Sequence, residues 1–572
     1  MDKIIRMRRI LSVLLTLENT KTVSDVEVDK GSGGWTWSQG LIGFHLLWQV
    51  VFWYLVYGYA LSGYRTIRGR GPIETLSSAY ISLVQKAYNL LLTTPPARQK
   101  LKEQLDGARR DLKRKLIDEK EAKVEALERH THLPPSGKGR AELRNMFNEL
   151  DKIHKADWET GKVSGAVYHG HQEGTHLGLA INEAIQHYLL SNPLHPDVFP
   201  GVRRMEAELI AMTLSLFNAD LAKGCGTTTS GGTESILMAC KAYRDWARAE
   251  RRITKPEMII PISAHAAFDK AGEYLGIYIH HIAVDPLSRK VDLRRAKRAI
   301  NANTIMIVGS APNFPDGIVD PIPELSTLAQ SYGIPLHVDC CLGSFIVPFL
   351  QEAGYSIGLF DFRLPGVTSI SCDTHKYADR KWRNYQFFTS TNWPGGVYAS
   401  PSIAGSRPGA LLAGAWAALL TMGHDGYLAS CKQIVGAARA IEIGIRSIKE
   451  LQVLGEPKVT VVAFKSDVLD VYQVGDKMSE KGWHCKLGSQ ESTAFQPFSD
   501  AIPAVNSFLI DLKEAVQEAK TMPTGSAEGS MVQIYGLGRS PVSGPFIVSE
   551  FAKMYLDVLY DVSPAETAVD TQ

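Results

Sequence analysis

The sequence predicts an α/β fold: a large domain with a mostly parallel β-sheet, a smaller α+β domain towards the C-terminus, and one N-terminal transmembrane helix. Three observations lead to this prediction. Short apolar runs alternate with helical patterns between about 160 and 375, a second strand and helix pattern occupies roughly 431–562, and an uncharged run fills 41–63. The 572 residues are too many for one ordinary domain.

Composition and charge exclude several classes of protein. With 45% hydrophobic and 21% charged residues, the chain can build a large core and is not a disordered protein. The formal charge of +2 is nearly neutral for this length, so no overall field favours nucleic acid. The cysteines are odd in number and lack CxxC spacing, which predicts a reducing compartment without a disulfide framework or a zinc site. They are Cys225, Cys240, Cys340, Cys341, Cys372, Cys431 and Cys485.

The segment 41–63 is predicted to cross a membrane once. It contains no charged residue, and a helix rising about 1.5 Å per residue would span a hydrocarbon core of roughly 30 Å over this length. A buried core helix would be shorter, and a signal peptide would begin nearer the N-terminus. Arginines directly after the segment predict that the rest of the chain is cytosolic. The supporting aromatic and basic residues are Trp35, Trp37, Tyr57, Tyr59, Tyr64, Arg65, Arg68 and Arg70.

The next part of the chain, 98–139, is dense in charges of both signs and ends in prolines and glycines. This composition predicts a solvated helical stalk that stops before the large domain. A helix that lies on a membrane surface or binds a partner is the alternative.

Alternating strand and helix patterns predict βαβ units in the large domain. Helix-spaced segments that end in glycine, such as PELSTLAQSYG, separate the apolar runs, and this alternation is typical of a parallel sheet. Ligands of such sheets bind at the carboxyl ends of the strands, so residues that follow each run are candidates for a site. The predicted strands are 257–263, 278–284, 304–310, 334–339 and 366–371, with 458–464 in the small domain and a closing helix over 549–561.

Two features match the phosphate and the ring nitrogen of pyridoxal phosphate. The Gly/Ser/Thr-rich turn at 225–234 opens into a helix, and the N–H groups of a helix N-terminus can hold a phosphate. Ordinary helix capping is the alternative. Asp339 closes the run IPLHVD, and a carboxylate at the end of a buried strand requires a positive partner such as a protonated pyridine nitrogen. A helix N-terminus would satisfy this carboxylate equally well.

Two further features match the aldehyde group and the ring face of pyridoxal phosphate. Lys376 follows the run at 366–371, where burial and neighbours can lower the pKa of its amine and let it form a Schiff base. His265 follows the strand at 257–263 and can stack on a cofactor ring. A surface lysine and a structural histidine are the alternatives. The convergence of all four features indicates the cofactor site.

The motifs around these residues resemble the sphingosine-1-phosphate lyase family. The resemblance extends from about 163 to the C-terminal region and includes the N-terminal apolar segment. It implies the type I fold of pyridoxal-phosphate-dependent enzymes, related to the group II decarboxylases. It also implies a homodimer with active sites at the subunit interface, anchored in the endoplasmic reticulum membrane. The motifs are SGGTESILMACKAYRD, SAHAAFDKA, IPLHVDCCLG, SCDTHKY, GSRPGA and SNPLHPDVFPGVRRMEAE.

The resemblance also implies a role for each residue of the cofactor site. Lys376 would carry the cofactor as a Schiff base, His265 would stack on its ring, and Asp339 would partner its pyridine nitrogen. The residues implied to help hold the phosphate are Gly232, Thr233 and His375.

The implied reaction is cleavage of the C2–C3 bond of a sphingoid base 1-phosphate into a long-chain aldehyde and phosphoethanolamine. Tyr168 and His195 match positions that line the substrate site and are the further catalytic candidates, while 404–410 would reach the pocket of the neighbouring subunit. Two alternatives remain: a decarboxylase of the same fold that acts on amino acids, and a non-catalytic, membrane-tethered homologue that keeps only the dimer surface.

The sequence departs from this family directly after Tyr377. Relatives continue through a segment like GYAPKGSS and an apolar strand, whereas only ADRKW (378–382) precedes RNYQFF here. We therefore expect an interior antiparallel strand to be missing, with unpaired backbone groups on both neighbours, unless 385–391 moves into the gap. The absent segment normally brings a second lysine near the substrate phosphate, and the context of Lys381 does not match it. We predict that this chain has impaired activity.

These predictions divide the chain into six parts. They are a luminal segment (1–40), a transmembrane helix (41–63), a charged stalk and arm (64–160), a large cofactor-binding domain (161–430), a small domain (431–562) and a tail (563–572).

Overall fold

A computed structural model describes residues 37–92, 94–113, 130–153, 162–163, 174–372, 376–379, 383–483, 485–488, 492–495, 502–522 and 544–559. The chain divides into two compact units, 1–64 and 65–572. The second unit contains the seven-stranded and four-stranded sheets, a two-stranded hairpin and the predicted site.

The N-terminal part is helical. Its elements are α2 (Trp37–Arg70), α3 (Pro72–Leu92), α4 (Pro95–Lys113) and α6 (Arg140–Ile153). Helix α2 includes the apolar run at 41–63, and α4 covers the first part of the predicted stalk; the part of that stalk at 114–129 lies outside the described residues.

The prediction of a membrane-spanning helix is not supported. No helix in the described part of the chain is both long enough and apolar enough to cross a bilayer. The run was chosen because it lacks charge, but uncharged polar side chains such as Gln49, Tyr57 and Tyr59 reduce its apolarity.

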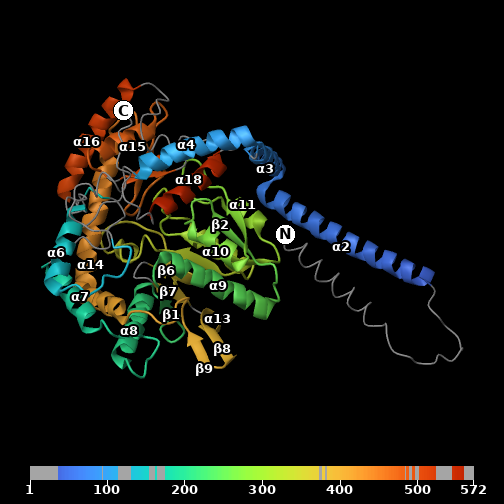
Figure 1. Ribbon diagram of the computed structural model, residues 1–572, viewed down its shortest axis with the longest axis horizontal. Coiled ribbons are helices and arrows are strands. Elements are labelled where there is room, and N and C mark those ends of the chain that lie inside the picture. Colours follow the sequence, from blue (N-terminus) through green and yellow to red (C-terminus); the bar gives the residue numbers. More distant parts are fainter. Residues whose placement is uncertain are drawn as a thin grey trace. The chain divides into compact units, whose positions relative to one another are not determined.

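A seven-stranded sheet forms the centre of the large domain (Figure 1). The strand order is β1-β7-β6-β5-β4-β2-β3, and β6, β5, β4, β2 and β3 are mutually parallel. This confirms the prediction of a mostly parallel sheet, and five of its strands coincide with the predicted apolar runs. The strands are β1 (Cys225–Thr228), β2 (Glu257–Pro261), β3 (Tyr278–Ile282), β4 (Thr304–Ser310), β5 (Leu336–Asp339), β6 (Val367–Cys372) and β7 (Lys376–Asp379).

The prediction of a missing interior strand is wrong. Strand β7 lies antiparallel between β1 and β6 and pairs with both, from Lys376 opposite Thr228 and Cys372 to Asp379 opposite Cys225 and Ser369. Each unpaired, buried backbone group would cost about 1–3 kcal/mol, so the nearest available chain fills the gap. That chain is KYAD and not 385–391. The latter contributes to α13 (Arg383–Gln386) and to β8 (Phe388–Trp393), which pairs with β9 (Gly396–Ser400) in a separate hairpin.

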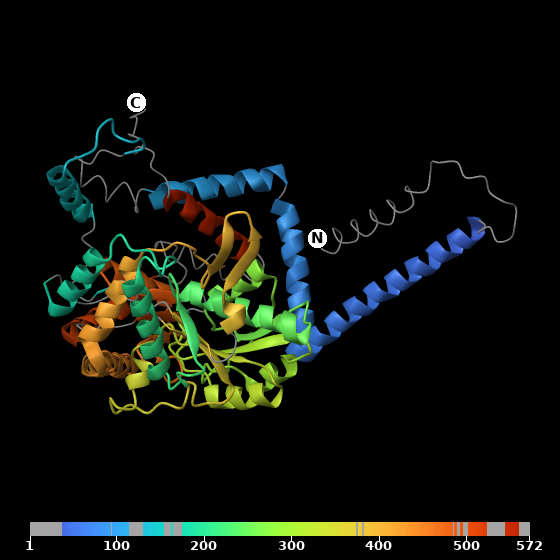
Figure 2. The same ribbon diagram turned by 90° about the horizontal axis from the view of Figure 1, so that it is seen from below.

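Helices cover both faces of the large sheet, as Figure 2 shows. On one face, α9 (Gly232–Arg251) and α10 (Ala267–Leu275) pack on Met258 and Ile260 of β2; on the other, α12 (Ile322–Ser331) packs in the core that contains Ile259. Alternate residues of one strand therefore enter opposite cores, as expected for a parallel sheet buried on both faces. Helix α11 (Leu293–Ala299) joins β3 to β4.

Three helices beside the sheet bring distant segments together. Helix α14 (Gly409–Arg446) packs against α7 (His176–His187) and α8 (Pro200–Leu216). It kinks at Gly423, whose backbone has a φ of 56°, a conformation that glycine adopts without a Cβ penalty.

The C-terminal part contains a second sheet with its own core. Its four antiparallel strands lie in the order β10-β11-β13-β12 and pack with two further helices and the C-terminal part of α14 around Trp483 and Phe508, whose rings are 5.1 Å apart. The elements are β10 (Gln452–Val453), β11 (Val462–Lys465), β12 (Lys486–Gly488), β13 (Ser492–Phe495), α15 (Val471–Glu480), α16 (Ile502–Thr521) and α18 (Gly544–Leu559).

The buried carboxylate of Glu257, at the start of β2, connects this strand to β3 and to the turn before β4. Glu257 accepts hydrogen bonds from His280 Nε2 (2.7 Å), Asn301 Nδ2 (2.8 Å) and Asn303 Nδ2 (3.0 Å), and Arg65 lies 3.3 Å away. Burial on its own raises the pKa of Glu257, but hydrogen bonds from the imidazole and the two amides outweigh it and lower the pKa to about 2. The ionised form is therefore the one that the fold stabilises.

We predict that Glu257→Gln lowers the free energy of unfolding by about 2–3 kcal/mol at neutral pH, because it leaves buried donors without an anionic acceptor. A depressed pKa stabilises the fold above the ordinary value near 4.5, and this stabilisation is lost as the pH falls towards about 2. The deficit of the variant should thus shrink between pH 4.5 and pH 3 in denaturant titrations. Asp269→Asn is the control, because its pair with His281 is exposed. Equal deficits for the two variants, or a deficit for Glu257→Gln that does not change with pH, would contradict this account.

Candidate functional site

The register of the sheet brings the predicted residues to one edge. Lys376 lies opposite Thr228 of β1 on one side and Cys372 of β6 on the other. On the next strand, Asp339 lies opposite Ser371, the residue before Cys372. The backbone of Lys376 is therefore close to both the turn that leaves β1 and the carboxylate that ends β5. The loop that joins β6 to β7, with His375, lies outside the described residues, as do Tyr168 and Lys381.

The turn between β1 and α9 is held by its own side chains. The carboxylate of Glu234 accepts hydrogen bonds from Ser230 N (2.7 Å) and Ile403 N (3.1 Å), and the hydroxyls of Thr229 and Ser235 are 2.8 Å apart. Gly232 and Thr233 begin the helix, where N–H groups have no intrahelical acceptor. The space beside Gly231 is open, since no atom lies within 4 Å of where its Cβ would be. A phosphate group fits this helix N-terminus.

Asp339 is buried, and only one of its two carboxylate oxygens accepts hydrogen bonds from described residues. It is 7% exposed, and its Oδ1 accepts hydrogen bonds from Cys341 N and Ser371 Oγ, both at 3.1 Å. No described residue donates a hydrogen bond to Oδ2. A buried carboxylate with one anchored oxygen and one available oxygen suits a cationic N–H partner such as a protonated pyridine nitrogen.

Three buried polar atoms at the same edge also lack partners within the described part of the chain. They belong to the ends of β2 and β4 or to the turns that follow: Ser263 Oγ, Ser310 Oγ and Asn313 Nδ2. Buried polar groups are rarely left unsatisfied, so these three atoms are candidates for contact with a polar ligand. The sequence contained no signal for them, because serine and asparagine are common in such turns.

His265 follows β2 and has a restrained ring. Its Nδ1 accepts a hydrogen bond from Ala267 N (3.1 Å), and its ring lies edge-to-face with Phe314 at 6.4 Å. The imidazole is exposed at this edge. Stacking of His265 on a cofactor ring stays a prediction.

The loop that carries His195 packs against the segment 404–410. Asn192 Nδ2 donates to Ser406 Oγ (3.1 Å), and Arg407 N donates to Asn192 Oδ1 (3.4 Å). The guanidinium of Arg407 forms two hydrogen bonds with the carboxylate of Glu206, at 2.8 and 3.0 Å, and a third with the carbonyl of Thr228 at 3.2 Å. Arg407 thereby ties this loop to the end of β1, opposite Lys376. Sequence reasoning assigned 404–410 to a neighbouring subunit and missed this contact within the chain.

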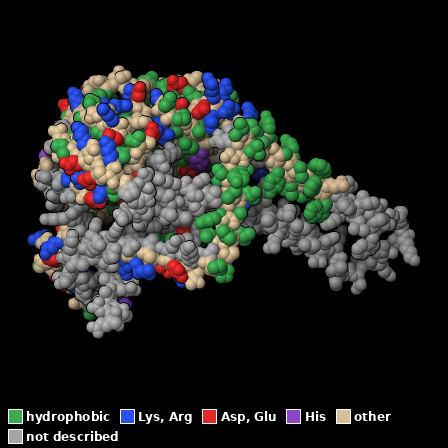
Figure 3. Space-filling model, turned by 90° about the horizontal axis from the view of Figure 1, so that it is seen from above, with side chains coloured by type: hydrophobic (Ala, Val, Ile, Leu, Met, Phe, Trp, Pro, Cys, Tyr) green, Lys and Arg blue, Asp and Glu red, His purple; other side chains and the backbone are tan. Residues whose placement is uncertain are grey.

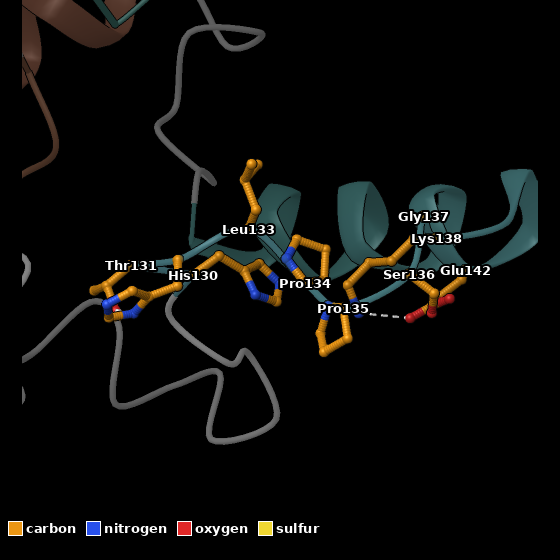
Figure 4. Close-up of a pocket in the computed structure, with 10 residues that line it drawn as sticks. His130, Thr131, Leu133, Pro134, Pro135, Ser136, Gly137, Lys138 and Glu142 are labelled. Atoms are coloured by element: carbon orange, nitrogen blue, oxygen red, sulfur yellow. Dashed lines mark hydrogen bonds and ion pairs between the residues drawn. The ribbon is translucent and has the colours of Figure 1, made fainter.

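A hollow of about 430 Å³ is lined only by the continuous segment 130–142, where Lys138 pairs with Glu142 at 2.6 Å (Figure 4). It contains none of the predicted site residues. Within the described ranges, no group of three or more His, Cys, Asp or Glu side chains is arranged to hold a metal ion.

An anion-binding helix N-terminus, a half-satisfied buried carboxylate and a lysine on the adjoining strand define a pyridoxal-phosphate-dependent enzyme. The comparisons agree: residues 177–379 match the family model described as the pyridoxal-dependent decarboxylase conserved domain. This match ends at Asp379, the last residue of β7.

Comparison with individual proteins identifies the family. The chain is 40% identical to sphingosine-1-phosphate lyase of Saccharomyces cerevisiae, over 87% of this chain and 86% of that protein. It is 46% identical to the Arabidopsis thaliana sphingosine-1-phosphate lyase, over 75% and 81%. The solved sphingosine-1-phosphate lyase of Burkholderia pseudomallei is 37% identical, with a TM-score of 0.69 over 77% of this chain and 99% of that one. This chain belongs to the sphingosine-1-phosphate lyase family.

Proposed function

We propose that this chain is a pyridoxal-phosphate-dependent aldehyde-lyase that cleaves the C2–C3 bond of sphingoid base 1-phosphates. The products are a long-chain aldehyde and phosphoethanolamine. Family membership over most of the chain supports this proposal, and the observation that carries it is the shared edge of Lys376, Asp339 and the α9 N-terminus. When bound, the cofactor supplies the electron sink that accepts the electrons of the broken bond.

The residues of this chain supply position and proton transfer. The N–H groups of Gly232 and Thr233 would hold the cofactor phosphate, and Oδ2 of Asp339 would accept a hydrogen bond from the ring nitrogen. The amine of Lys376 would hold the cofactor aldehyde until the substrate amine replaces it. Bond cleavage removes a proton from the 3-hydroxyl and returns one to C2, so the reaction consumes no water. His195 and Tyr168 are the proposed substrate-facing residues.

Exchange of the lysine tests the reaction class. We predict that Lys376→Ala abolishes both the visible absorbance of the bound cofactor and product formation, because Lys376 is the amine proposed to bind the cofactor aldehyde. The assay follows long-chain aldehyde and carbon dioxide from a sphingoid base 1-phosphate and from amino acids. Aldehyde formation by the unsubstituted chain supports the lyase, whereas carbon dioxide would support the decarboxylase alternative. Lys241→Ala is the control, because that amine instead binds the carbonyls of Tyr385, Gln386 and Phe387.

We propose that the shortened chain after Tyr377 lowers the activity. The sheet remains complete only because the four residues that begin with Lys376 act as its interior strand, paired on both sides. The backbone of the cofactor lysine is thus committed to strand pairing, and only 373–375 connect it to β6. The second lysine of the family segment has no counterpart.

Insertion of the relatives' segment tests this proposal. We predict that GYAPKGSS and the following apolar strand, placed after Tyr377, increase kcat by roughly tenfold or more, because the inserted strand would pair with β1 and β6 and release Lys376. A Gly/Ser insert of equal length at Gly395, in the turn between β8 and β9, is the control for insertion as such. Unchanged turnover in the repaired chain would show that the short form is fully competent.

We propose a homodimer and attachment to the endoplasmic reticulum membrane, with the second unit in the cytosol. A mostly apolar groove of about 540 Å³ between α8 and α14 supports the dimer, since Leu221 and Leu420 at this groove are 55% and 52% exposed. Exposed aromatic side chains along α2 support membrane attachment. Figure 3 shows hydrophobic side chains gathered along the N-terminal helices. The most exposed of these aromatic side chains are Trp53, Tyr54, Tyr57 and Tyr59.

Removal of residues 1–64 separates these two proposals. We predict that the shortened protein stays in the supernatant when microsomes are sedimented but still has the mass of two chains by light scattering. Substitution Leu420→Glu in the full chain should leave sedimentation with membranes intact and reduce the mass to one chain, because it places a charge at the groove. Sedimentation of the shortened protein, or a dimer that survives Leu420→Glu, would contradict the respective proposal.

A further inference from the structure

A continuous series of buried polar side chains runs from helix α9 to Asp339. Its members are Tyr243, Ser369, His337 and Ser371, none of which is measurably exposed to solvent. Buried polar groups are costly unless they are paired, so a series of four that ends at a carboxylate requires an explanation.

The strands place these residues on one face. His337 and Asp339 are two residues apart on β5, and Ser369 and Ser371 are two apart on β6, so each pair shares a side of the sheet. The register sets His337 opposite Ser369 and Asp339 opposite Ser371. Tyr243 of α9 reaches Ser369 from the helix that covers this face.

The hydrogen bonds have one consistent direction. Asp339 Oδ1 can only accept, so Ser371 Oγ donates to it at 3.1 Å. A serine hydroxyl has a single hydrogen, which means that Ser371 accepts from His337 Nε2 at 3.2 Å. His337 Nδ1 then accepts from Ser369 Oγ at 2.7 Å, and the hydroxyl of Ser369 accepts from Tyr243. Every donor in the series is directed towards the carboxylate.

The imidazole in the middle of the series is neutral. Burial lowers the pKa of His337 to about 4, although the charge of Asp339 acts in the opposite direction. A neutral imidazole has one donor and one acceptor nitrogen, which matches the two serine contacts. The ring of Phe268 lies edge-to-face with it at 5.9 Å and completes its apolar surroundings.

We infer that Ser371 and His337 are positioning residues for Asp339. The Ser371 hydroxyl, itself oriented by His337, donates to Oδ1 and thereby favours the ionised carboxylate and directs Oδ2 towards the ring nitrogen of the cofactor. This inference rests on the proposed function, and it adds two side chains that touch neither cofactor nor substrate. Their contribution is to keep the electron sink protonated.

Substitutions of equal shape isolate the hydroxyl. Threonine and valine have nearly the same volume, so Ser371→Thr and Ser371→Val differ only in the hydroxyl, which donates to Asp339 and accepts from His337. We expect Ser371→Val to bind pyridoxal phosphate about 10- to 100-fold more weakly than Ser371→Thr, the range for one hydrogen bond to a charged group. Titration of each apoprotein with pyridoxal phosphate, followed by absorbance, gives the dissociation constants. Turnover should fall in parallel, with little change in KM.

A double-mutant cycle distinguishes positioning from general stability. In the Asp339→Asn background, Ser371→Val should add little further loss of cofactor affinity, since the group that it positions has lost its charge. Ser326→Ala is the matched control, because its buried hydroxyl on the opposite face only accepts from Gly366 N at 2.9 Å. That variant should keep the affinity of the unsubstituted protein for pyridoxal phosphate. His337→Gln should fall between the threonine and valine variants.

Equal cofactor affinities for the threonine and valine variants, or full additivity of Ser371→Val with Asp339→Asn, would overturn the inference. If the valine variant does not fold, the same comparison is made between Ser371→Ala and the unsubstituted protein, with the same outcomes. Failure of the unsubstituted protein to bind pyridoxal phosphate would instead contradict the proposed function.

Discussion

Pairing of the backbone at the interior of the large sheet is the constraint on which the rest of the site depends. Strands β1 and β6 each present a row of buried N–H and C=O groups, and β7 satisfies both rows with only four residues. The same four residues begin with Lys376, the lysine that we propose to hold the cofactor. Strand pairing therefore sets the backbone position of Lys376: it lies between Thr228 and Cys372, with β6 between its own strand and that of Asp339.

The remainder of the site surrounds this strand with groups of defined charge. The α9 N-terminus, steadied by Glu234, provides positive backbone dipoles on one side. Asp339 provides the negative group on the other side. The buried series that begins at Tyr243 ends at Ser371, whose hydroxyl donates a hydrogen bond to Asp339. Arg407 connects the loop that carries His195 to the end of β1. Within the described residues, Oδ2 of Asp339 and the buried polar atoms of Ser263, Ser310 and Asn313 at this edge have no partner.

Much of this arrangement could be predicted from periodicity and spacing. The apolar runs located β2 to β6 to within a few residues, and the position of Asp339 and the glycine-rich turn at strand ends indicated the edge of the sheet. The fate of the shortened chain could not be predicted, because the apolar pattern assigned no strand to KYAD, whereas pairing with the two neighbouring strands made it one. Apolarity at 41–63 was overestimated, since lack of charge is not the same as lack of polarity. The roles of His337 and Arg407 depend on partners that are distant in sequence, at Ser371 and Glu206, so no local signal contains them.

Reductive trapping tests the central claim that Lys376 holds the cofactor at this edge. The purified, folded full-length chain is incubated with pyridoxal phosphate and treated with borohydride, and its peptides are then analysed by mass spectrometry. The account predicts one stable pyridoxyl-phosphate adduct, on the lysine at position 376. A protein without an adduct, or with its adduct on a different lysine, would contradict it.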